Sequence, residues 1–209
     1  MIKQKKKIRF ESLGIETIVS NGIHYSWDGE IDNLHDHATQ LRQRYAKKGF
    51  YKDNKDTYDD IEAERKQYGD KINGTLSRFY KFQLHPPPRS LGLYIHAYIR
   101  KGLSKETAIF VRGHEEAHAL YCLGKAHLLG KEVDKICGTN GFTEEAFRMM
   151  NPIHDIALFE LIANYGGRHA LVLAQLAEKI NIKPEEIEEL SRRLWGKQYQ
   201  SDFQAEVNF

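Results

Sequence analysis

The sequence predicts an α+β fold that is mainly helical, with a small antiparallel sheet near the N-terminus. Three observations support this prediction. Residues 8–27 alternate apolar and polar side chains around Asn21-Gly22, a dipeptide that favours a two-residue hairpin turn. Later apolar residues recur mostly at helical spacing. Hydrophobic residues make up 41% and charged residues 29% of the 209, the balance of a globular protein with one sizeable core.

The region after the hairpin is strongly charged and has helical periodicity. Its apolar residues fit two amphipathic helices, one over 31–45 and one over 61–76. His35 and His37 are two apart and point to different sides of such a helix, where we expect solvent exposure. Pro86-Pro87-Pro88 offers no amide donors and marks a boundary. We therefore divide the chain into an N-terminal hairpin with a charged helical extension, 1–85, and a second region, 86–209.

The second region is expected to begin with a capped helix. Ser104 can accept a hydrogen bond from the first turn, which also holds Glu106, and Gly124 is a plausible end for this helix. A shorter helix is expected over 143–150.

The sequence pattern in the rest of this region predicts one more helix and then a pair of helices. The helix should cover 153–165 and end at Gly166-Gly167. The segment 171–195 is typical of two helices joined by a turn at 181–183, with Pro184 in the first turn of the second helix.

Bulk composition excludes several classes of protein. The net charge of +2 predicts no general affinity for nucleic acid, and no stretch approaches the ~20 apolar residues of a membrane span. The basic run MIKQKKK is not followed by the apolar core of a secretory signal. Cys122 and Cys137 have no CxxC partner, so neither a disulfide framework nor a thiolate metal cage is indicated. We expect a cytoplasmic protein without a membrane partner.

The strongest chemical signal is the run HEEAH at 114–118. Residues four apart share one helix face, so His114 and His118 can place two imidazoles on one metal ion. Glu115 would then lie beside the open coordination position as a general base toward a zinc-bound water. Arg112 and Glu116 add charges to this helix, but at four residues apart they can pair with each other. The competing interpretation is a solvated helix that binds no metal.

A catalytic zinc needs a third protein ligand. We prefer Glu160, which lies in the apolar run FELIANYGG, where an unpaired buried carboxylate would be costly. Glu144 and Glu145 are alternatives, although a first helical turn after Thr143 explains acidic residues there without a metal. His127 is a weaker alternative, because it follows Gly124 in a spacing that only approximates HExxHxxGxxH.

Four further residues are candidates for lining the site. Tyr165 and His169 follow Glu160 and could donate a hydrogen bond to the oxyanion of peptide hydrolysis. His154 is a possible lining residue, and Asp155 a possible acceptor behind a histidine ligand. For each of them a packing or surface role is the simpler alternative.

The order of HEEAH, then ELIAN at 160–164, then the helix pair LAEKINIKPEEIEEL resembles the ImmA/IrrE family of intracellular zinc peptidases. Members typically show HExxH, a later ExxAN segment with a glutamate ligand, and a region like a helix-turn-helix. The resemblance implies that His114, His118 and Glu160 are zinc ligands and that Glu115 is the catalytic acid and base. It also implies cleavage of a repressor or other regulatory protein.

The sequence thus favours a zinc metallopeptidase that acts on a protein or peptide substrate. A DNA-associated regulator that uses the helix pair is one alternative, but four glutamates on its second helix would repel phosphates: Glu185, Glu186, Glu188 and Glu189. A metal-free helical protein that binds a partner is the other. Imidazole and carboxylate ligands suit Zn²⁺ but accept other first-row ions as well.

Overall fold

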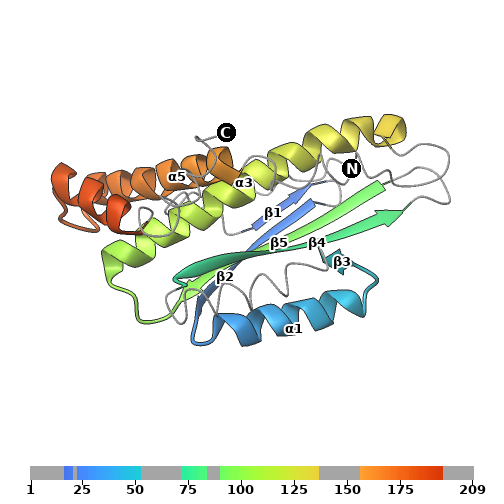
Figure 1. Cartoon of the computed structure of the whole chain (residues 1–209), viewed down its shortest axis with the longest axis horizontal. Helices are drawn as coiled ribbons and strands as arrows, with labels where there is room; N and C mark the ends of the chain where they lie inside the picture. The colour runs from blue at the N-terminus through green and yellow to red at the C-terminus, as the bar shows by residue number, and fades with distance from the viewer. Residues whose placement is uncertain (1–16, 21–22, 53–71, 84–89, 137–155, 195–209) are drawn as a thin grey trace, which may run out of the picture.

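The protein is a three-layer α+β structure (Figure 1). The computed structural model describes residues 17–20, 23–52, 72–83, 90–136 and 156–194. A central sheet carries α1 on one face and α3 on the other, and α5 packs on α3. The strands are β1 (Thr17–Ser20), β2 (Ile23–Ile31), β3 (Tyr51–Lys52), β4 (Gly74–Gln83) and β5 (Ser90–Arg100). The helices are α1 (Leu34–Ala46), α3 (Lys105–Ile136), α5 (Ile156–Leu176) and a helix over 184–194.

The class prediction is confirmed, but the sheet is larger than predicted. Its five strands lie in the order β1-β2-β5-β4-β3. The hairpin prediction is confirmed, because β1 pairs antiparallel with β2 and Ser20 lies opposite Ile23. The sheet is mixed rather than antiparallel, since β2 and β5 run parallel. Strands from both sides of residue 85 therefore build the surface on which α3 packs.

Part of the predicted helix over 61–76 is strand. Leu76 lies in β4, which pairs antiparallel with β5 from Gly74 to Gln83, while residues 61–71 lie outside the described part of the chain. The run TLSRFYKF alternates between the two faces of the sheet, and this period of two prevailed over the helical spacing of its apolar residues. Leu76 and Tyr80 pack toward α3, whereas Phe79 packs toward α1.

The other predicted N-terminal helix is confirmed as α1. Asn33 caps it, because its side chain accepts a hydrogen bond from the Asp36 amide. Leu41 and Tyr45 are buried against Phe79 and Tyr98 of the sheet. This apolar stripe fixes α1 to the face of the sheet opposite α3 (Figure 1).

The expectation that His37 faces solvent is wrong. Its Nε2 lies 2.7 Å from Asp28 Oδ2, and His96 Nδ1 lies 2.9 Å from Asp28 Oδ1. The other ring nitrogen of His96 is 2.8 Å from the Tyr45 hydroxyl. The pairing of β2 with β5 shifts between Trp27 and Gly29, and this bulge inserts Asp28 as an extra residue. A chain of polar contacts therefore links α1 to β2 and β5.

The Asp28 network predicts acid sensitivity. Burial raises the pKa of Asp28, but hydrogen bonds with His96 and His37 outweigh it and the pKa is lowered. Stability from this group is present above the ordinary Asp pKa of about 3.9 and is lost as the pH falls through the folded value. We expect Asp28→Asn to lower the free energy of unfolding at pH 7 by about 1–3 kcal/mol and to flatten its fall below pH ~4.

Urea denaturation at several pH values measures this effect. Asp32→Asn is the control, because the Asp32 side chain is 81% exposed and pairs only at the surface with Lys101. An equal response of the two variants would contradict a stabilising role for the Asp28 network.

Helix α3 begins as predicted but does not end at Gly124. Ser104 Oγ accepts a hydrogen bond from the Thr107 amide at 3.3 Å, which confirms the cap. The helix continues to Ile136. Gly124 has no left-handed backbone angle, and strong helix formers surround it in LGKAHLL, so the helix tolerates the ~1 kcal/mol that a glycine costs in its interior. The shorter helix expected over 143–150 lies outside the described residues.

Helix α5 also continues past its predicted end at Gly166-Gly167, as far as Leu176. These glycines are sites of close approach to α3. A Cβ on Gly166 would lie 2.4 Å from Ala117 Cβ and 2.7 Å from the Gly113 carbonyl oxygen, and one on Gly167 would lie 2.8 Å from the Phe110 carbonyl oxygen. The glycines therefore let the backbones of α3 and α5 nearly touch.

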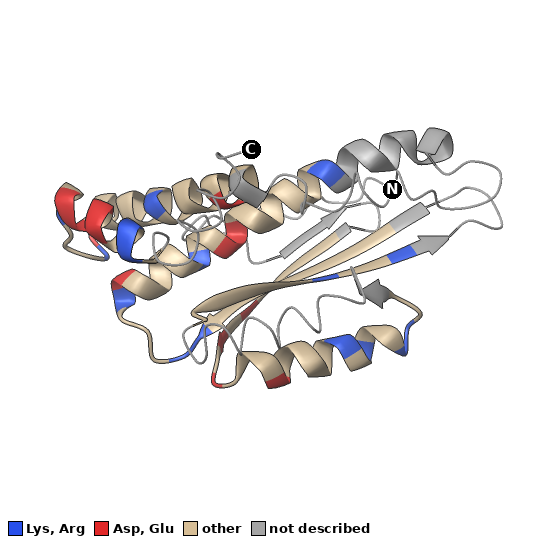
Figure 2. Cartoon of the chain, in the orientation of Figure 1, with Lys and Arg blue, Asp and Glu red and all other residues tan. Residues whose placement is uncertain are grey.

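A helix pair joined by a turn is present, but its first member is the end of α5 rather than a separate helix, and the turn begins after Leu176 instead of at the predicted 181–183. A turn follows, and the helix over 184–194 starts at Pro184, where the Lys183 amide donates to Glu186 Oε2 at 2.7 Å. Ile182 and Ile187 are buried against Phe110 of α3. In Figure 2 the ribbon over this last helix is marked mostly as acidic, from its four glutamates. No helix of the described residues combines the length and apolar character that a membrane crossing requires.

The contact between α3 and α5 yields a second prediction. Gly166→Ala gains about 1 kcal/mol in helix propensity, but its methyl group would meet Ala117 and the Gly113 backbone at sub-contact distances. We expect a net loss of about 1–3 kcal/mol in the free energy of unfolding, measured with urea.

Gly124→Ala is the matched control for this substitution. Among the described residues, nothing outside the local turn of α3 lies within 4 Å of a Cβ at Gly124, so the same change in a helix interior should stabilise the protein by up to about 1 kcal/mol. Stabilisation by both substitutions would show that the helices are not in contact at Gly166.

Candidate metal centre

Three side chains converge where α3 and α5 pack together. His114 and His118 lie one turn apart on α3, and their Nε2 atoms are 3.0 Å from each other. Glu160 extends from the first turns of α5, with Oε2 at 3.4 Å from His114 Nε2 and Oε1 at 3.3 Å from His118 Nε2. The predicted grouping of these residues is therefore observed, and the three can hold a metal ion.

The distances in this triad fit a tetrahedral metal site. Ligand atoms about 2.0–2.1 Å from a zinc ion lie roughly 3.3 Å from one another, which matches the spacing between Glu160 and each histidine. Glu160 Oε2 is buried, and at 3.4 Å from His114 Nε2 it is too far for a strong, well-aligned hydrogen bond. Two imidazole nitrogens and a carboxylate oxygen thus point at one small volume, as a cation would require.

The electrostatics of the triad favour an ionised carboxylate. Burial raises the pKa of Glu160, but hydrogen bonds with His114 and His118 outweigh it and lower the pKa to about 2. Burial lowers the pKa of His118 to about 4. Burial also lowers the pKa of His114, but the hydrogen bond with Glu160 and the charges of Glu115 and Glu160 raise it overall. His118 is therefore neutral at pH 7 and can bind a cation without losing a proton. The raised pKa of His114 means that a metal ion competes with a proton more strongly there than at a free imidazole.

Apolar and aromatic side chains surround the triad. The Phe159 ring lies against His118, with 3.9 Å between ring centroids, and Phe110 lies 6.3 Å from His114. His118 and Glu160 are buried, and His114 retains a side-chain exposure of 17%. Exclusion of water strengthens charge interactions inside the site.

Glu115 is buried between α3 and the sheet. A Cβ on Gly74 would lie 2.8 Å from Glu115 Oε1, so a glycine at this point of β4 makes room for the carboxylate. Glu115 is not one of the three metal-facing groups, but its charge contributes to raising the pKa of His114. This is the relation expected of a carboxylate that lies beside a metal site without binding the ion.

The two charged residues beside the motif pair with each other. Arg112 Nε donates to Glu116 Oε1 at 2.9 Å, and Glu116 is fully buried. The Arg112 guanidinium also lies over the Trp27 ring of β2, at 4.5 Å from its centroid. The four-residue spacing predicted this pairing. Because the two charges pair with each other and the guanidinium also contacts an aromatic ring, α3 can carry both charges and still pack against the sheet.

Other candidate residues lie apart from the triad or outside the described part of the chain. Tyr165 is 60% exposed, with the Arg168 guanidinium over its ring, and His169 is exposed as well. Among the described residues, neither contacts the triad. His127 lies on the straight continuation of α3, about 13.5 Å beyond His118 along the axis, so the glycine turn of HExxHxxGxxH is not formed. Four candidates lie outside the described residues: Glu144, Glu145, His154 and Asp155.

Sequence reasoning missed Arg78. This residue of β4 reaches α3, where its Nη1 lies 3.6 Å from Cys122 Sγ, one helical turn beyond His118. Its charge contributes to the lowered pKa of His118, after burial. The alternation in TLSRFYKF was the available signal, because it places Leu76, Arg78 and Tyr80 on the same face of a strand.

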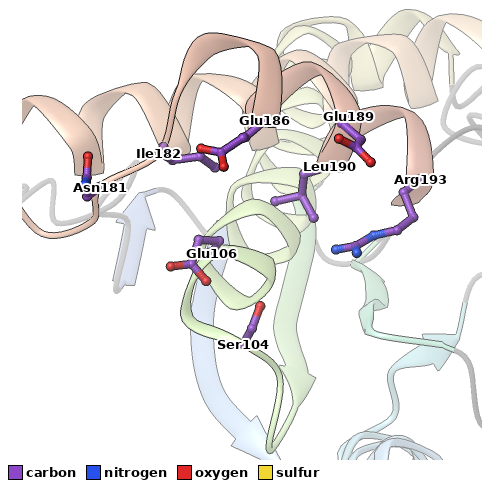
Figure 3. A pocket seen from close by; sticks show the side chains of 8 residues that line it. All are labelled: Ser104, Glu106, Asn181, Ile182, Glu186, Glu189, Leu190 and Arg193. Atoms are coloured by element: carbon purple, nitrogen blue, oxygen red, sulfur yellow. The ribbon is translucent and has the colours of Figure 1, made fainter.

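A separate open pocket of about 410 Å³ lies at the start of α3 (Figure 3). Glu106, Glu186 and Glu189 line it together with Arg193. Glu106 precedes His114 by eight residues, or about 12 Å along the helix. The pocket is therefore distinct from the triad.

Comparison with known proteins found no relative. No protein-family model matches the chain, and no curated protein or solved structure is significantly similar to it. Functional inference for this chain therefore depends on the geometry of the site.

The triad predicts that a metal ion stabilises the fold. We expect about one Zn²⁺ per chain, with a gain of about 2.7 kcal/mol in the free energy of unfolding at a free concentration 100 times the Kd. Elemental analysis and thermal denaturation of protein purified without a histidine tag measure both quantities.

The controls for this prediction use residues inside and outside the triad. His118→Ala and Glu160→Ala should lose the ion and its stabilising effect, whereas His169→Ala should keep both. Retention of zinc by Glu160→Ala would show that a different residue supplies the third ligand.

Proposed function

We propose that the protein is a zinc-dependent peptidase that hydrolyses a protein or peptide substrate. The observation that carries this proposal is the convergence of His114, His118 and Glu160. A structural zinc site is closed by four protein ligands, whereas three protein ligands with an open position are typical of catalytic zinc. Two imidazoles and one carboxylate form such a set, and Zn²⁺ is the proposed ion among the first-row metals that accept it.

The residues of the site divide into metal ligands and one acid/base group. His114, His118 and Glu160 would hold the ion. When bound, the ion would acidify a water molecule and polarise the substrate carbonyl. Glu115 accepts the proton of the attacking water at its carboxylate and then donates it to the leaving amine. The burial of Glu115 against Gly74 restricts its rotamers, so the carboxylate is held in place before substrate binds.

The ImmA/IrrE resemblance supports a regulatory protein as the substrate and a cytoplasmic location as the setting. It rests on the motif residues, since no family model matches. The structure gives one motif residue a physical role: Asn164, at the end of ELIAN, is buried, and its Oδ1 accepts a hydrogen bond from Ser191 Oγ at 2.7 Å. This bond joins α5 to the helix over 184–194 and steadies the helix that carries Glu160.

The DNA-binding alternative has less support. The helix over 184–194 presents exposed glutamates, and Ile187 and Leu190 are used in packing against α3. Phosphate contacts require basic groups at this surface. We therefore propose a structural role for this helix, in support of the α3 and α5 pair.

A substitution at Glu115 tests the proposed function. Glu115→Gln should retain zinc, because Glu115 is not a ligand, but should lower peptide hydrolysis by about 100-fold or more because no group accepts the proton of the water. Cleavage of a random-sequence peptide library, followed by mass spectrometry, measures the activity.

Glu106→Gln is the matched control, since Glu106 lies on the same helix and away from the triad. We expect it to cleave the library at the rate of the parent protein. An active Glu115→Gln variant, or a zinc-loaded parent without any cleavage, would overturn the proposed mechanism.

A further inference from the structure

Helix α5 is apolar on two opposite sides. One side, which includes Ala163, Ala170 and Leu171, is buried against α3 and the helix over 184–194. At 3.6 residues per turn, six large apolar residues fall on the opposite side within an arc of about 120°. These six residues are 37% to 76% exposed, and we call them the outer stripe of α5: Leu158, Leu161, Tyr165, Val172, Leu173 and Leu176. A surface helix is normally polar on the side that faces water, so the outer stripe indicates a contact with a further partner.

The outer stripe is large enough to form an interface. With about 200 Å² for a fully exposed side chain of this size, the exposed fractions correspond to roughly 600 Å² per chain. This area is at the upper limit of the apolar patches that monomeric proteins usually expose, about 300–600 Å². Two outer stripes in contact would bury about 1,200 Å² in total, which reaches the range of specific and stable interfaces.

The outer stripe is also symmetric along the helix. Leu158 and Leu176 lie nine residues before and after Gly167. Leu161 and Leu173 lie six residues before and after it. In an antiparallel pair of identical α5 helices centred at this glycine, each of these leucines would therefore face its counterpart on the other copy. A two-fold interface requires this kind of self-complementarity, because residue i contacts residue j and j contacts i.

The centre of the outer stripe suits the same arrangement. Tyr165 and His169 lie two residues before and after the centre, so the tyrosine of each copy would face the histidine of the other. Tyrosine is enriched among the residues that contribute most to interface stability. Apart from Glu160, Arg168 is the only Lys, Arg, Asp or Glu of α5, and it pairs with Glu188 of the same chain. Two copies of α5 can therefore approach without repulsion between uncompensated like charges.

We propose that two copies of the chain associate through the outer stripes of their α5 helices, which run antiparallel about a two-fold axis at residue 167. Glu160 extends from the other side of α5, toward the histidines of α3, so each chain keeps its own metal centre. The dimer does not depend on the proposed peptidase function.

Sedimentation equilibrium of the full chain tests the association. At about 1–100 μM the parent protein should have twice the mass of one chain, with a dissociation constant in this range or below. Tyr165→Lys should weaken the dimer by about 100-fold or more, because it removes an aromatic contact and adds a charge at two places near the axis. A parent protein that stays monomeric throughout this range would overturn the proposal.

Two further variants serve as checks on Tyr165→Lys. Leu176→Lys should also weaken the dimer, and its fold should be retained because Leu176 is 76% exposed and a cation is favourable in the last turn of a helix. Gln40→Lys is the matched control, since it adds the same charge at an exposed position of α1, on the far side of the sheet. It should leave the dissociation constant unchanged. A dimer that both Tyr165→Lys and Leu176→Lys leave intact would contradict the assignment of the interface to α5.

Cysteine substitutions test the antiparallel arrangement. When Leu158→Cys and Leu176→Cys chains are mixed and oxidised with diamide, a disulfide should join one chain of each kind, because these positions would lie side by side. Either variant alone should not form this bond, since the two copies of its new cysteine would be about 27 Å apart. The parent protein, treated in the same way, controls for Cys122 and Cys137. Cross-linking of each variant with itself, and not of the mixture, would indicate parallel helices and overturn the arrangement.

Other occupants of the outer stripe would give different results. If the chain's own residues outside the described part cover the stripe, the parent protein is monomeric and Leu176→Lys lowers its free energy of unfolding more than Gln40→Lys does. If a different protein or a lipid surface covers it, the parent is monomeric and the two substitutions have equal effects on stability. Either result would overturn the proposed dimer.

Discussion

The close contact between α3 and α5 is the constraint on which the rest of the site depends. Gly113 of α3 and Gly166 of α5 meet backbone to backbone, and Gly167 meets the Phe110 carbonyl in the same way. Side chains at these positions would push the helices apart. Glu160 lies about two turns before Gly166 on α5, so the distance between the two backbones directly sets how near its carboxylate comes to the imidazoles of α3.

Charged groups are buried on both faces of the sheet, and several of them pair with a neighbouring charged or polar group. On the α3 face, Arg112 pairs with Glu116 and covers Trp27. On the α1 face, Asp28 contacts His37 of α1 and His96 of β5. Pairing limits the desolvation cost of these charges. It also fixes how the paired side chains are oriented, because the partners come from different strands or from successive turns of a helix. The sheet thereby holds α3 in one position.

Sequence predictions that depend on neighbouring residues were accurate, whereas several that depend on residues distant in the sequence were wrong. The hairpin, α1 and the start of α3 depend on neighbouring residues, and these predictions are confirmed. The predicted ends at Gly124 and Gly166-Gly167 were wrong for a shared reason. A glycine that ends a helix and a glycine that lets another helix approach have the same local sequence, and only the partner helix distinguishes them. The solvent exposure expected of His37 failed similarly, because its partner Asp28 is nine residues away on a strand bulge.

The sequence by itself determined the pair of imidazoles, because residues four apart on a helix lie on one face whatever surrounds the helix. It also indicated Glu160 through the cost of burying a carboxylate in an apolar run. Only the tertiary structure brought Glu160 within 3.4 Å of both histidines, and only the tertiary structure placed Arg78 beside the turn that follows His118. These contacts join separate elements, so they depend on the crossing of α3 and α5 and on the register of β4, neither of which any local sequence pattern encodes.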